Sequence, residues 1–301
     1  MESSHTAVYR QNNIWRWIIT ACGLLMIIIT LAIGAFLCYK GVGTFTTYGH
    51  SVGEFLFSSK WAPADNAQGG GKVGAAIFIF GSIITCTLAL LISTPFSIAS
   101  AIFMTEISPG IGRKILQPAV EIFVGIPSVV YGWIGLTILV PFIKDLFDLK
   151  FGFSVLAAGI VLAVMIYPTI TSLSADAIRS IPKSFRQASY GLGATRWQTI
   201  SQVVIPASKS GLMTAIVLGL ARAFGEALAV AMVIGKMKAF PESLLSPTTN
   251  LTAAIASDMG GAMEGSEYNI ALWSMALLLF IISLVFIFII HYISAKGGHK
   301  A

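Results

Sequence analysis

The sequence holds 301 residues, of which 56% are hydrophobic and only 11% are charged. A soluble domain of this length carries roughly 25% charged residues, so the composition excludes a water-soluble globular protein. The formal net charge of +6 does not indicate nucleic-acid binding, because the basic residues are spread over short loops between apolar runs.

Six apolar runs are long enough to cross a bilayer as helices, which takes about 20 residues for a core of about 30 Å. In chain order they are Trp17–Leu37, Val73–Met104, Pro118–Phe142, Val155–Leu173, Gly211–Gly235 and Ile270–Ile290. The sequence therefore predicts an all-α integral membrane protein with about six transmembrane helices. We expect residues 17–292 to form the membrane domain, with a short segment over 1–16 before it and a tail over 293–301 after it.

The distribution of Lys and Arg predicts the orientation of these spans, since cytoplasmic loops are enriched in both. With the N-terminus inside, eleven of these residues fall in cytoplasmic segments and seven in external ones, and Arg222 lies within a span. Most of the external lysines also have acidic residues nearby in the sequence. We therefore expect a cytoplasmic (plasma) membrane protein with both termini in the cytoplasm.

Two of the predicted external loops are long. The first, Lys40–Lys72, contains the run Gly69-Gly70-Gly71 before its final lysine, but no Ser or Thr follows, so it is not a phosphate-binding loop of an ATPase. The second, Lys236–Asn269, contains a stretch over Thr252–Met263 that we expect to form a short helix at the membrane interface.

The long cytoplasmic connection over residues 174–210 is the most polar part of the chain. Its pattern predicts two short helices separated by Gly191 and Gly193, with Thr195 capping the second and Pro206 beginning the fifth span. A rigid helix pair that projects from the membrane is suited to docking into a groove of a soluble partner. An ordinary amphipathic loop remains the alternative on the pattern alone.

This connection resembles the EAA loop of ABC-importer permeases. The family's slots are filled here by Gln187, Ala188 and Ser189, then by Gly193 and, at the family's spacing, by Pro206. Gln replaces the family's Glu, and Ser replaces its second Ala. The resemblance implies a type I ABC-importer permease fold in which this loop forms the coupling helices that seat on ATPase subunits.

The residues assigned by this resemblance to coupling with the ATPase are Arg186, Gln187, Ala188, Gly193 and Pro206. The sequence has no match to the ATP-binding motif G-x-x-x-x-G-K-[ST]. We therefore expect no cofactor on this chain, no enzymatic activity, and ATP with Mg²⁺ bound by a partner subunit.

Charged residues are costly within a span and often mark a transport pathway. Arg222 and Glu226 are four residues apart in the fifth span, which would place them on one helix face where they can pair. One interpretation is a buried ion pair that fixes helix packing. The other is a pathway in which the guanidinium binds a phosphate-like oxyanion and the carboxylate keeps it from binding too tightly.

The third span contains Pro127, which removes a backbone donor and loosens the helix. Ser128 and Tyr131 place polar groups beside it. A plain kink and a role in the pathway are both consistent with this pattern. No second break of this kind is predicted in a matching position elsewhere in the chain.

Several segments resemble the PstC-type permease of the bacterial phosphate-specific ABC importer. They are Trp61–Pro63, Thr105–Pro109, Gly125–Gly132, Ala221–Val230 and the coupling loop. The resemblance implies import of inorganic phosphate by a complex with a second permease of PstA type, an ATPase dimer and an external phosphate-binding protein. PstA-type chains share versions of the two pathway segments, and the Trp61–Pro63 loop favours PstC.

Other functions are weighed against this one. A permease for another oxyanion fits the same arginine, and a secondary anion transporter would need no ATPase. An intramembrane hydrolase is disfavoured, because the sequence lacks H-E-x-x-H and none of its four histidines lies deep in a predicted span. The three cysteines show no CxxC spacing, which disfavours a metal site or a disulfide framework.

Overall fold

The computed structural model describes the backbone of residues 2–297 and the side chains of residues 15–293. Within this part of the chain, six helices are long and apolar enough to cross a membrane, which confirms the predicted number. They run over Trp15–Thr46, Ala76–Ile107, Ser128–Leu146, Val155–Arg179, Arg196–Gly225 and Glu267–Ile293. Both predicted terminal segments continue a span as helix, apart from residue 1 and residues 298–301, which lie outside the described part.

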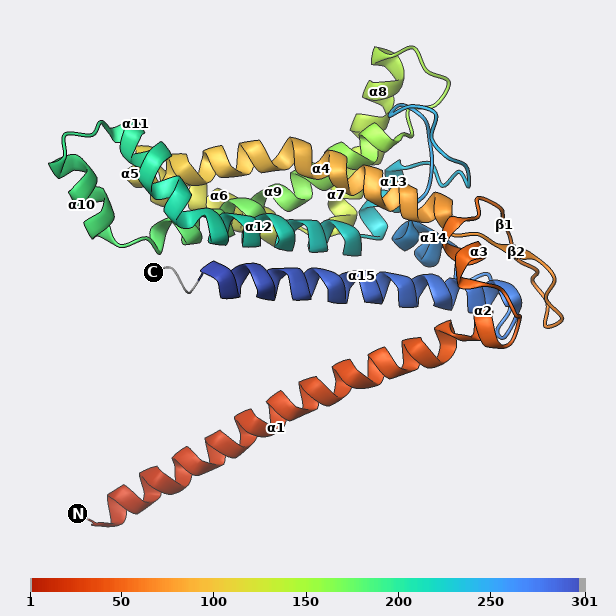
Figure 1. Ribbon diagram of the computed structural model, residues 1–301, viewed down its shortest axis with the longest axis horizontal. Helices are drawn as coiled ribbons and strands as arrows, with labels where there is room; N and C mark the ends of the chain where they lie inside the picture. Colours follow the sequence, from red (N-terminus) through yellow and green to blue (C-terminus); the bar gives the residue numbers. More distant parts are fainter. Residues whose placement is uncertain (1, 298–301) are drawn as a thin grey trace.

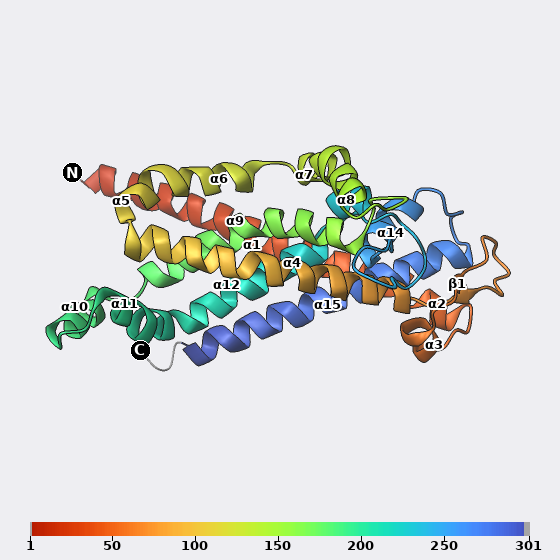
Figure 2. The ribbon, with the colours of Figure 1, turned by 90° about the horizontal axis from the view of Figure 1, so that it is seen from above.

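Five helices give the molecule its elongated shape (Figures 1 and 2). They are α1 (Glu2–Gly41), α4 (Ala76–Ile102), α9 (Val155–Arg179), α12 (Ile205–Gly225) and α15 (Glu267–Gly297). The last four lie side by side, whereas α1 packs on α15 near one end and then diverges from the bundle. From Trp15 on, most apolar side chains of α1 are therefore exposed, as expected for a helix that faces lipid or another subunit.

The centre of the bundle is the contact between α4 and α9. Small residues on α9, among them Ala157, Ala158 and Gly159, are buried there. A Cβ atom added at Gly159 would lie 2.6 Å from the Leu88 side chain of α4, so glycine permits the close approach. Small residues have this role in membrane bundles, where close backbone packing replaces the hydrophobic driving force.

The third predicted span is interrupted, so the prediction of one continuous helix over Pro118–Phe142 is wrong. Helix α6 (Gln117–Gly125) ends at an extended pair, Ile126 and Pro127, and α7 (Ser128–Ile134) begins after it. Proline disfavours helical geometry in the residue before it and cannot donate a backbone hydrogen bond. The span then continues through a π-helical turn into α8 (Val140–Leu146).

The fifth predicted span, Gly211–Gly235, is also interrupted. Helix α12 ends at Gly225, Glu226 is extended at φ −77° and ψ 121°, and α13 (Leu228–Val233) begins two residues later. The hydroxyl of Thr252 donates a 2.6 Å hydrogen bond to the Glu226 carbonyl and so satisfies a backbone group that the break frees. The structure thus contains the second broken helix that the sequence does not predict.

The start of the fifth helix also differs from prediction, because Pro206 does not begin it. Helix α11 (Arg196–Thr199) continues through the π-helix η4 (Ile200–Val204) into α12. A proline ring clashes with the carbonyl four residues earlier in an α-helix, and a wider turn relieves that clash. The amide of Ile205 bonds to the Ile200 carbonyl, which closes the wide turn just before the proline.

The other π-helical stretches in the described chain follow the same rule. They are η1 (Phe103–Ile107), η2 (Gly112–Leu116) and η3 (Gly135–Leu139), and η1 and η2 flank the short α5 (Pro109–Ile111). Each ends two residues before a proline, namely Pro109, Pro118 and Pro141. The prolines therefore set where these helices widen.

One end of the molecule carries a small β-hairpin that is not predicted, and we call it the hairpin end (Figure 1). It contains α2 (Gly43–Thr46), α3 (Val52–Phe57), β1 (Trp61–Ala62) and β2 (Lys72–Val73). The two strands are antiparallel, with Trp61 opposite Val73. The ring of Trp61 packs edge-on against Phe78 of α4 at 4.9 Å between centroids.

The carboxylate of Glu267, at the start of α15, holds this hairpin in place through hydrogen bonds. It accepts hydrogen bonds from the ring Nε2 of His50 at 2.7 Å and from three backbone amides, those of Ala64, Gly70 and Gly71, at 2.7, 3.2 and 2.8 Å. Glycine in two of these positions lets the backbone curl closely around the two oxygens. The glycine run of the first long loop is therefore a cradle for a carboxylate of the same chain.

The second long loop forms a short helix as predicted, but the helix is shorter than Thr252–Met263 and begins one residue earlier. Helix α14 covers Leu251–Asp258, and its first residues are buried among α4, α13 and α15. Leu251 is 0% exposed and Ala254 only 4%. The segment therefore packs into the protein, where its first turn lies beside the break of the fifth helix.

Candidate functional site

Arg222 lies in the last turn of α12, where the helix breaks, and is half-buried. Its Nη1 atom donates a 2.7 Å hydrogen bond to the hydroxyl of Thr169 on α9. The unpaired carbonyls at the C-terminal end of a helix give that end a partial negative charge, which favours a cation there. The break itself therefore stabilises the guanidinium within the span.

Glu226 does not pair with Arg222, so the predicted ion pair on one helix face is wrong. The break at Glu226 ends the helical spacing that would align the two side chains. Instead, a carboxylate oxygen of Glu226 accepts a 3.0 Å hydrogen bond from the amide of Ala229 in the first turn of α13. No ion pair joins Arg222 to an acidic residue in the described chain; Arg222 bonds to the Thr169 side chain, and the Glu226 carboxylate bonds to the Ala229 amide.

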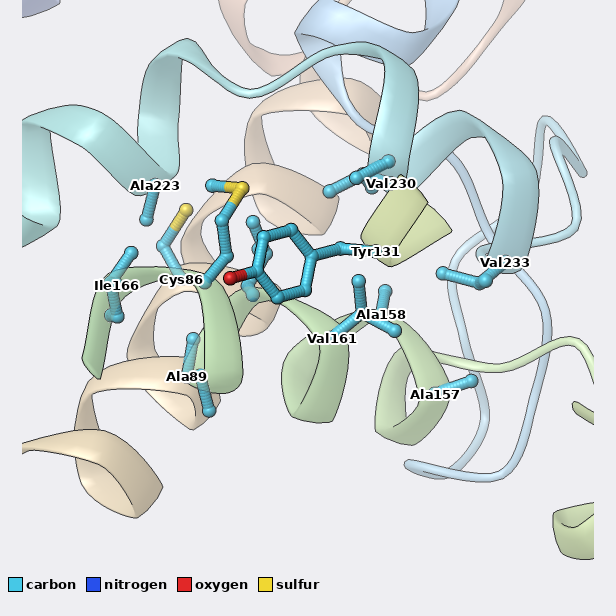
Figure 3. Close-up of a cluster of buried hydrophobic side chains, with 14 of the residues drawn as sticks. Cys86, Ala89, Tyr131, Ala157, Ala158, Val161, Ile166, Ala223, Val230 and Val233 are labelled. Atoms are coloured by element: carbon cyan, nitrogen blue, oxygen red, sulfur yellow. The ribbon is translucent and has the colours of Figure 1, made fainter. Parts of the chain in front are cut away.

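Tyr131 connects the broken third helix to this region. Its hydroxyl donates a 2.8 Å hydrogen bond to the carbonyl of Phe123, which spans the gap between α6 and α7. Figure 3 shows the ring between Val230 of α13 and Val161 of α9, so it lies where three helices meet.

The two interrupted helices touch each other beside this tyrosine. A Cβ atom added at Gly132 of α7 would lie 2.8 Å from the Cα of Ala229 in α13. Ser128 is half-buried at the first position of α7, and Glu226 lies just before α13. The predicted pathway residues therefore come together at one pair of helix breaks, although two of them do not make the predicted contact.

An open cavity of about 690 Å³ lies on the hairpin side of these breaks. It is lined by residues of α7, α13 and α14 and, at its edge, by Lys236. Several large apolar residues of α7 and α13 are exposed, including Val129, Trp133 and Leu228, whose exposed fractions are 45%, 59% and 52%. This face of the bundle is unpartnered in the single chain.

The predicted coupling loop has the expected helix pair at the end opposite the hairpin (Figure 1). Helix α10 (Lys183–Gly191) ends at the predicted glycine, and Gly193 adopts φ +81°, a conformation that glycine takes without strain. Thr195 caps α11, and its partner Gln198 completes a reciprocal capping box. The two-helix prediction is confirmed, except that the second helix is continuous with α12.

The outer surface of this loop is apolar and exposed. Leu192 is 90% exposed, and Phe185 and Trp197 are 48% and 64% exposed. A groove of about 630 Å³ between α10 and η4 is lined in part by Phe185, Ala188 and Leu192. Such a cluster on a projecting loop is typical of a protein-binding surface.

The residues that were assigned to coupling occupy different environments. Gln187, Ala188 and Pro206 are exposed. Arg186, by contrast, contacts the same chain, because its guanidinium forms an ion pair with Glu106 at 2.5 Å. Glu106 lies in a stretch that the sequence matched to a family motif, but it was not predicted to contribute to the site.

No group of three or more His, Cys, Asp or Glu side chains that could hold a metal ion occurs among the described residues. The three cysteines are free thiols, and Cys86 is buried in α4. The two sites described above are the broken helices around Arg222 and the outer surface of the coupling loop. Their chemistry is that of a cation at a helix break and an apolar docking surface.

The family model described as "binding-protein-dependent transport system inner membrane component" matches residues 93–297. The chain belongs to this family. It is 54% identical over 281 residues to the probable ABC transporter permease protein YqgH of Bacillus subtilis, covering 93% of this chain and 90% of that one. It is 35% identical to the phosphate transport system permease protein PstC of Haemophilus influenzae, covering 88% and 87% of the two chains.

Solved structures show the same fold at low sequence identity. A chain of the MetNI methionine ABC transporter superposes with a TM-score of 0.53 and 20% identity, covering 72% of this chain and 96% of that one. A chain of a bacterial ABC transporter for the acidic polysaccharide alginate gives 0.54 and 17%, covering 95% and 96%. The predicted ABC-importer permease fold is therefore confirmed.

This permease is a multi-pass inner membrane subunit and not an enzyme. Permeases of this family bind no cofactor of their own and work with ATPase subunits and a binding protein. The exposed loop surface at α10 and the exposed face at α7 and α13 are where the isolated chain leaves apolar groups without partners.

Proposed function

We propose that this permease imports inorganic phosphate and is the PstC-type subunit of its transporter. The observation that carries the proposal is the position of Arg222, a permanently charged guanidinium at the break of a membrane helix, to which no carboxylate of the described residues is paired. The names of several relatives at about 35% identity support the same substrate. A guanidinium presents several donors in a planar fork, which matches the oxygens of a phosphate group.

Because Arg222 forms no ion pair with the described residues, its guanidinium is more accessible to an anion than that of an ion-paired arginine. Among the contacts of the described chain, Arg222 donates a hydrogen bond only from its Nη1 atom, to Thr169. The Glu226 carboxylate accepts a hydrogen bond from the first turn of α13, and the Tyr131 hydroxyl donates one to the backbone of α6. We assign Arg222 to anion binding, and Tyr131, Ser128 and Glu226 to shaping the pathway around it.

The partners that we propose follow from the two unpartnered surfaces. A second permease of PstA type would cover the exposed face of α7 and α13, closing the pathway between the two subunits. An ATPase dimer would seat on the coupling loop, using its exposed groove at Ala188 and Leu192. A periplasmic or extracellular phosphate-binding protein would dock at the hairpin end, and lipid would cover the exposed parts of α1.

The coupling residues then have distinct tasks. Gln187 and Ala188 are exposed and would contact the ATPase, whereas Gly193 sets the turn between α10 and α11. Pro206, with the π-helical turn before it, would set the angle at which the loop joins α12. In this arrangement α10, the start of α1 and the end of α15 lie on the cytoplasmic side, since Figure 1 places them at the same end.

The test is uptake of radiolabelled phosphate by cells that lack their own high-affinity system and express this permease with its partner subunits. The variants are Arg222→Gln, Arg222→Lys and, as a control, Lys209→Gln, which removes an exposed cation from the same helix. We expect Arg222→Gln to lower the uptake rate at least about tenfold, equivalent to about 1.4 kcal/mol. Arg222→Lys keeps the charge without the fork and should retain part of the rate, and the control should match the wild type.

Each outcome discriminates between functions. Uptake that stops when the ATPase partner is inactivated supports an ABC phosphate importer. Phosphate uptake that continues without the ATPase would instead identify a secondary carrier. ATP-dependent uptake of sulfate or molybdate in place of phosphate would keep the permease and overturn the substrate. Normal phosphate uptake by Arg222→Gln would remove Arg222 from the pathway.

A further inference from the structure

Helix α10 is held to the rest of the permease almost without apolar packing. Its one buried residue is Ser189, whose hydroxyl lies 2.9 Å from that of Thr199. A helix with so little buried surface gains little stability from the hydrophobic effect. Polar contacts must therefore fix its position relative to the membrane helices.

The strongest of these contacts is made by Arg186. Its Nε and Nη2 atoms bond to the carboxylate of Glu106 at 2.5 to 3.2 Å, in a fork geometry. Its remaining donors reach the carbonyls of Ile178 and Ile181 at 3.0 and 2.8 Å. The Arg186 and Glu106 side chains are only 18% and 9% exposed, so the pair is largely shielded from water.

These bonds connect three separate parts of the fold. Glu106 lies in η1 at the end of the second span, and Ile178 lies in the last turn of α9, the fourth span. From α11, Arg196 bonds to the backbone carbonyls of Glu106 and of Ile107, the latter at 2.7 Å. The coupling loop thus holds the end of the second span by a side chain from each of its two helices.

We propose that Glu106 is a positioning residue through which movement of the coupling loop reaches the second membrane helix, while Arg186 also contacts the end of the fourth. The inference rests on the proposed docking of this loop to an ATPase. It goes beyond that docking by naming the residue of the permease to which the movement is transmitted. Arg186 accordingly acts within the permease and does not itself contact the ATPase. When the ATPase displaces α10, the Arg186–Glu106 pair makes η1 move with it, and the bond from Arg186 to the Ile178 carbonyl carries the end of α9 along.

The local charge distribution offers a matched control. The cavity around Glu106, about 630 Å³ in volume, is lined by five basic residues and this one acid. The basic residues are Arg113, Arg179, Lys183, Arg186 and Arg196. Arg113 lies on the same cavity but makes no ion pair or hydrogen bond with Glu106 among the described contacts. Replacing Arg113 changes the cavity's charge without cutting the connection.

The test is the number of anions transported per ATP hydrolysed by the complete transporter in proteoliposomes. The variants are Glu106→Gln, Arg186→Gln, the double substitution, and Arg113→Gln as the control. We expect each of the first three to keep most of the ATPase activity and to lower the transport-to-ATP ratio about tenfold. The double variant should be no worse than Arg186→Gln alone, since that substitution already removes the contact with Glu106. The charge-reversed pair Glu106→Arg with Arg186→Glu should recover part of the ratio.

Other outcomes overturn the proposal. A normal ratio in Glu106→Gln would show that movement passes by another route. Loss of ATPase binding in Arg186→Gln but not in Glu106→Gln would make Arg186 a partner contact. If Glu106→Gln does not assemble, Arg186→Gln carries the test alone, and a wild-type ratio there would equally reject the role. Because the ratio can be measured with whichever anion the wild type carries, a wrong substrate assignment does not affect this test.

Discussion

Replacing Glu267 with Gln should loosen the hairpin end without disturbing the membrane helices. Glu267 is 1% exposed, and its two oxygens accept four hydrogen bonds, from His50, Ala64, Gly70 and Gly71. A glutamine keeps one acceptor oxygen of similar shape but loses the charge and the second oxygen. About two of the four donors then lose their partner while they remain partly buried.

The magnitude follows from these contacts. A hydrogen bond to a charged group contributes about 1.5–3 kcal/mol, so the loss of two such bonds costs about 3 kcal/mol at the low end. If the loop opens locally, this cost raises the population of the open form about 100-fold. The amides of Gly70 and Gly71 should therefore exchange their hydrogens about 100-fold faster in Glu267→Gln than in the wild type.

The assay is hydrogen exchange of this segment in detergent or nanodiscs, followed by mass spectrometry. The control is Glu264→Gln, which removes an exposed carboxylate three residues earlier and should leave the exchange unchanged. Exchange at Gly70 and Gly71 within about threefold of the wild-type rate would refute the reasoning, since it would mean that the carboxylate does not hold the loop. Faster exchange throughout α4 and α9 would instead indicate global destabilisation.

Three further predictions concern pH, helix packing and docking. Burial opposes the charged form of His50, but its hydrogen bonds to two glutamates outweigh this and raise its pKa. The stability that protonated His50 adds is therefore full below its ordinary value of 6.5 and lost as the pH rises through the raised pKa. Loop exchange, corrected for intrinsic rates, should be slower at about pH 6 than at about pH 8, and His50→Gln should abolish the difference. At Gly132, an added methyl group would meet the α13 backbone at 2.8 Å, whereas at Gly125 it would meet nothing within 4 Å. Gly132→Ala should cost about 1–3 kcal/mol and reduce uptake, while Gly125→Ala should do neither, and equal thermal stability of the two would contradict this. Finally, Leu192→Glu should abolish co-purification with the ATPase at unchanged Tm, whereas Phe57→Glu, an equally exposed change at the hairpin end, should not. Retained ATPase binding in the Leu192 variant would show that the groove is not the docking surface.

The candidate site was predictable where it depends on residue type and local spacing. An arginine within an apolar run is costly, so Arg222 stands out in the sequence alone. The turn glycines and the Thr195 cap act within a few residues, and the structure has them as predicted. Thr169 and Glu106 were missed because their importance comes from partners 53 and 80 residues away. Single-sequence patterns do not record such distances.

The sequence by itself determined the class of the protein. The length and apolarity of its helices require a membrane, because a water-facing surface would need many more charges. Its loop spacing also indicated the permease family to which the chain belongs.

Only the tertiary structure decided where helices end inside the bundle. A break within the membrane is possible only where neighbours satisfy the freed backbone groups, as Thr252 does for Glu226 and Tyr131 does for Phe123. The same packing separates Arg222 from Glu226, turns the glycine run toward Glu267, and joins Arg186 to Glu106. These contacts lie far apart along the chain, so they are set by the folded bundle and not by local sequence.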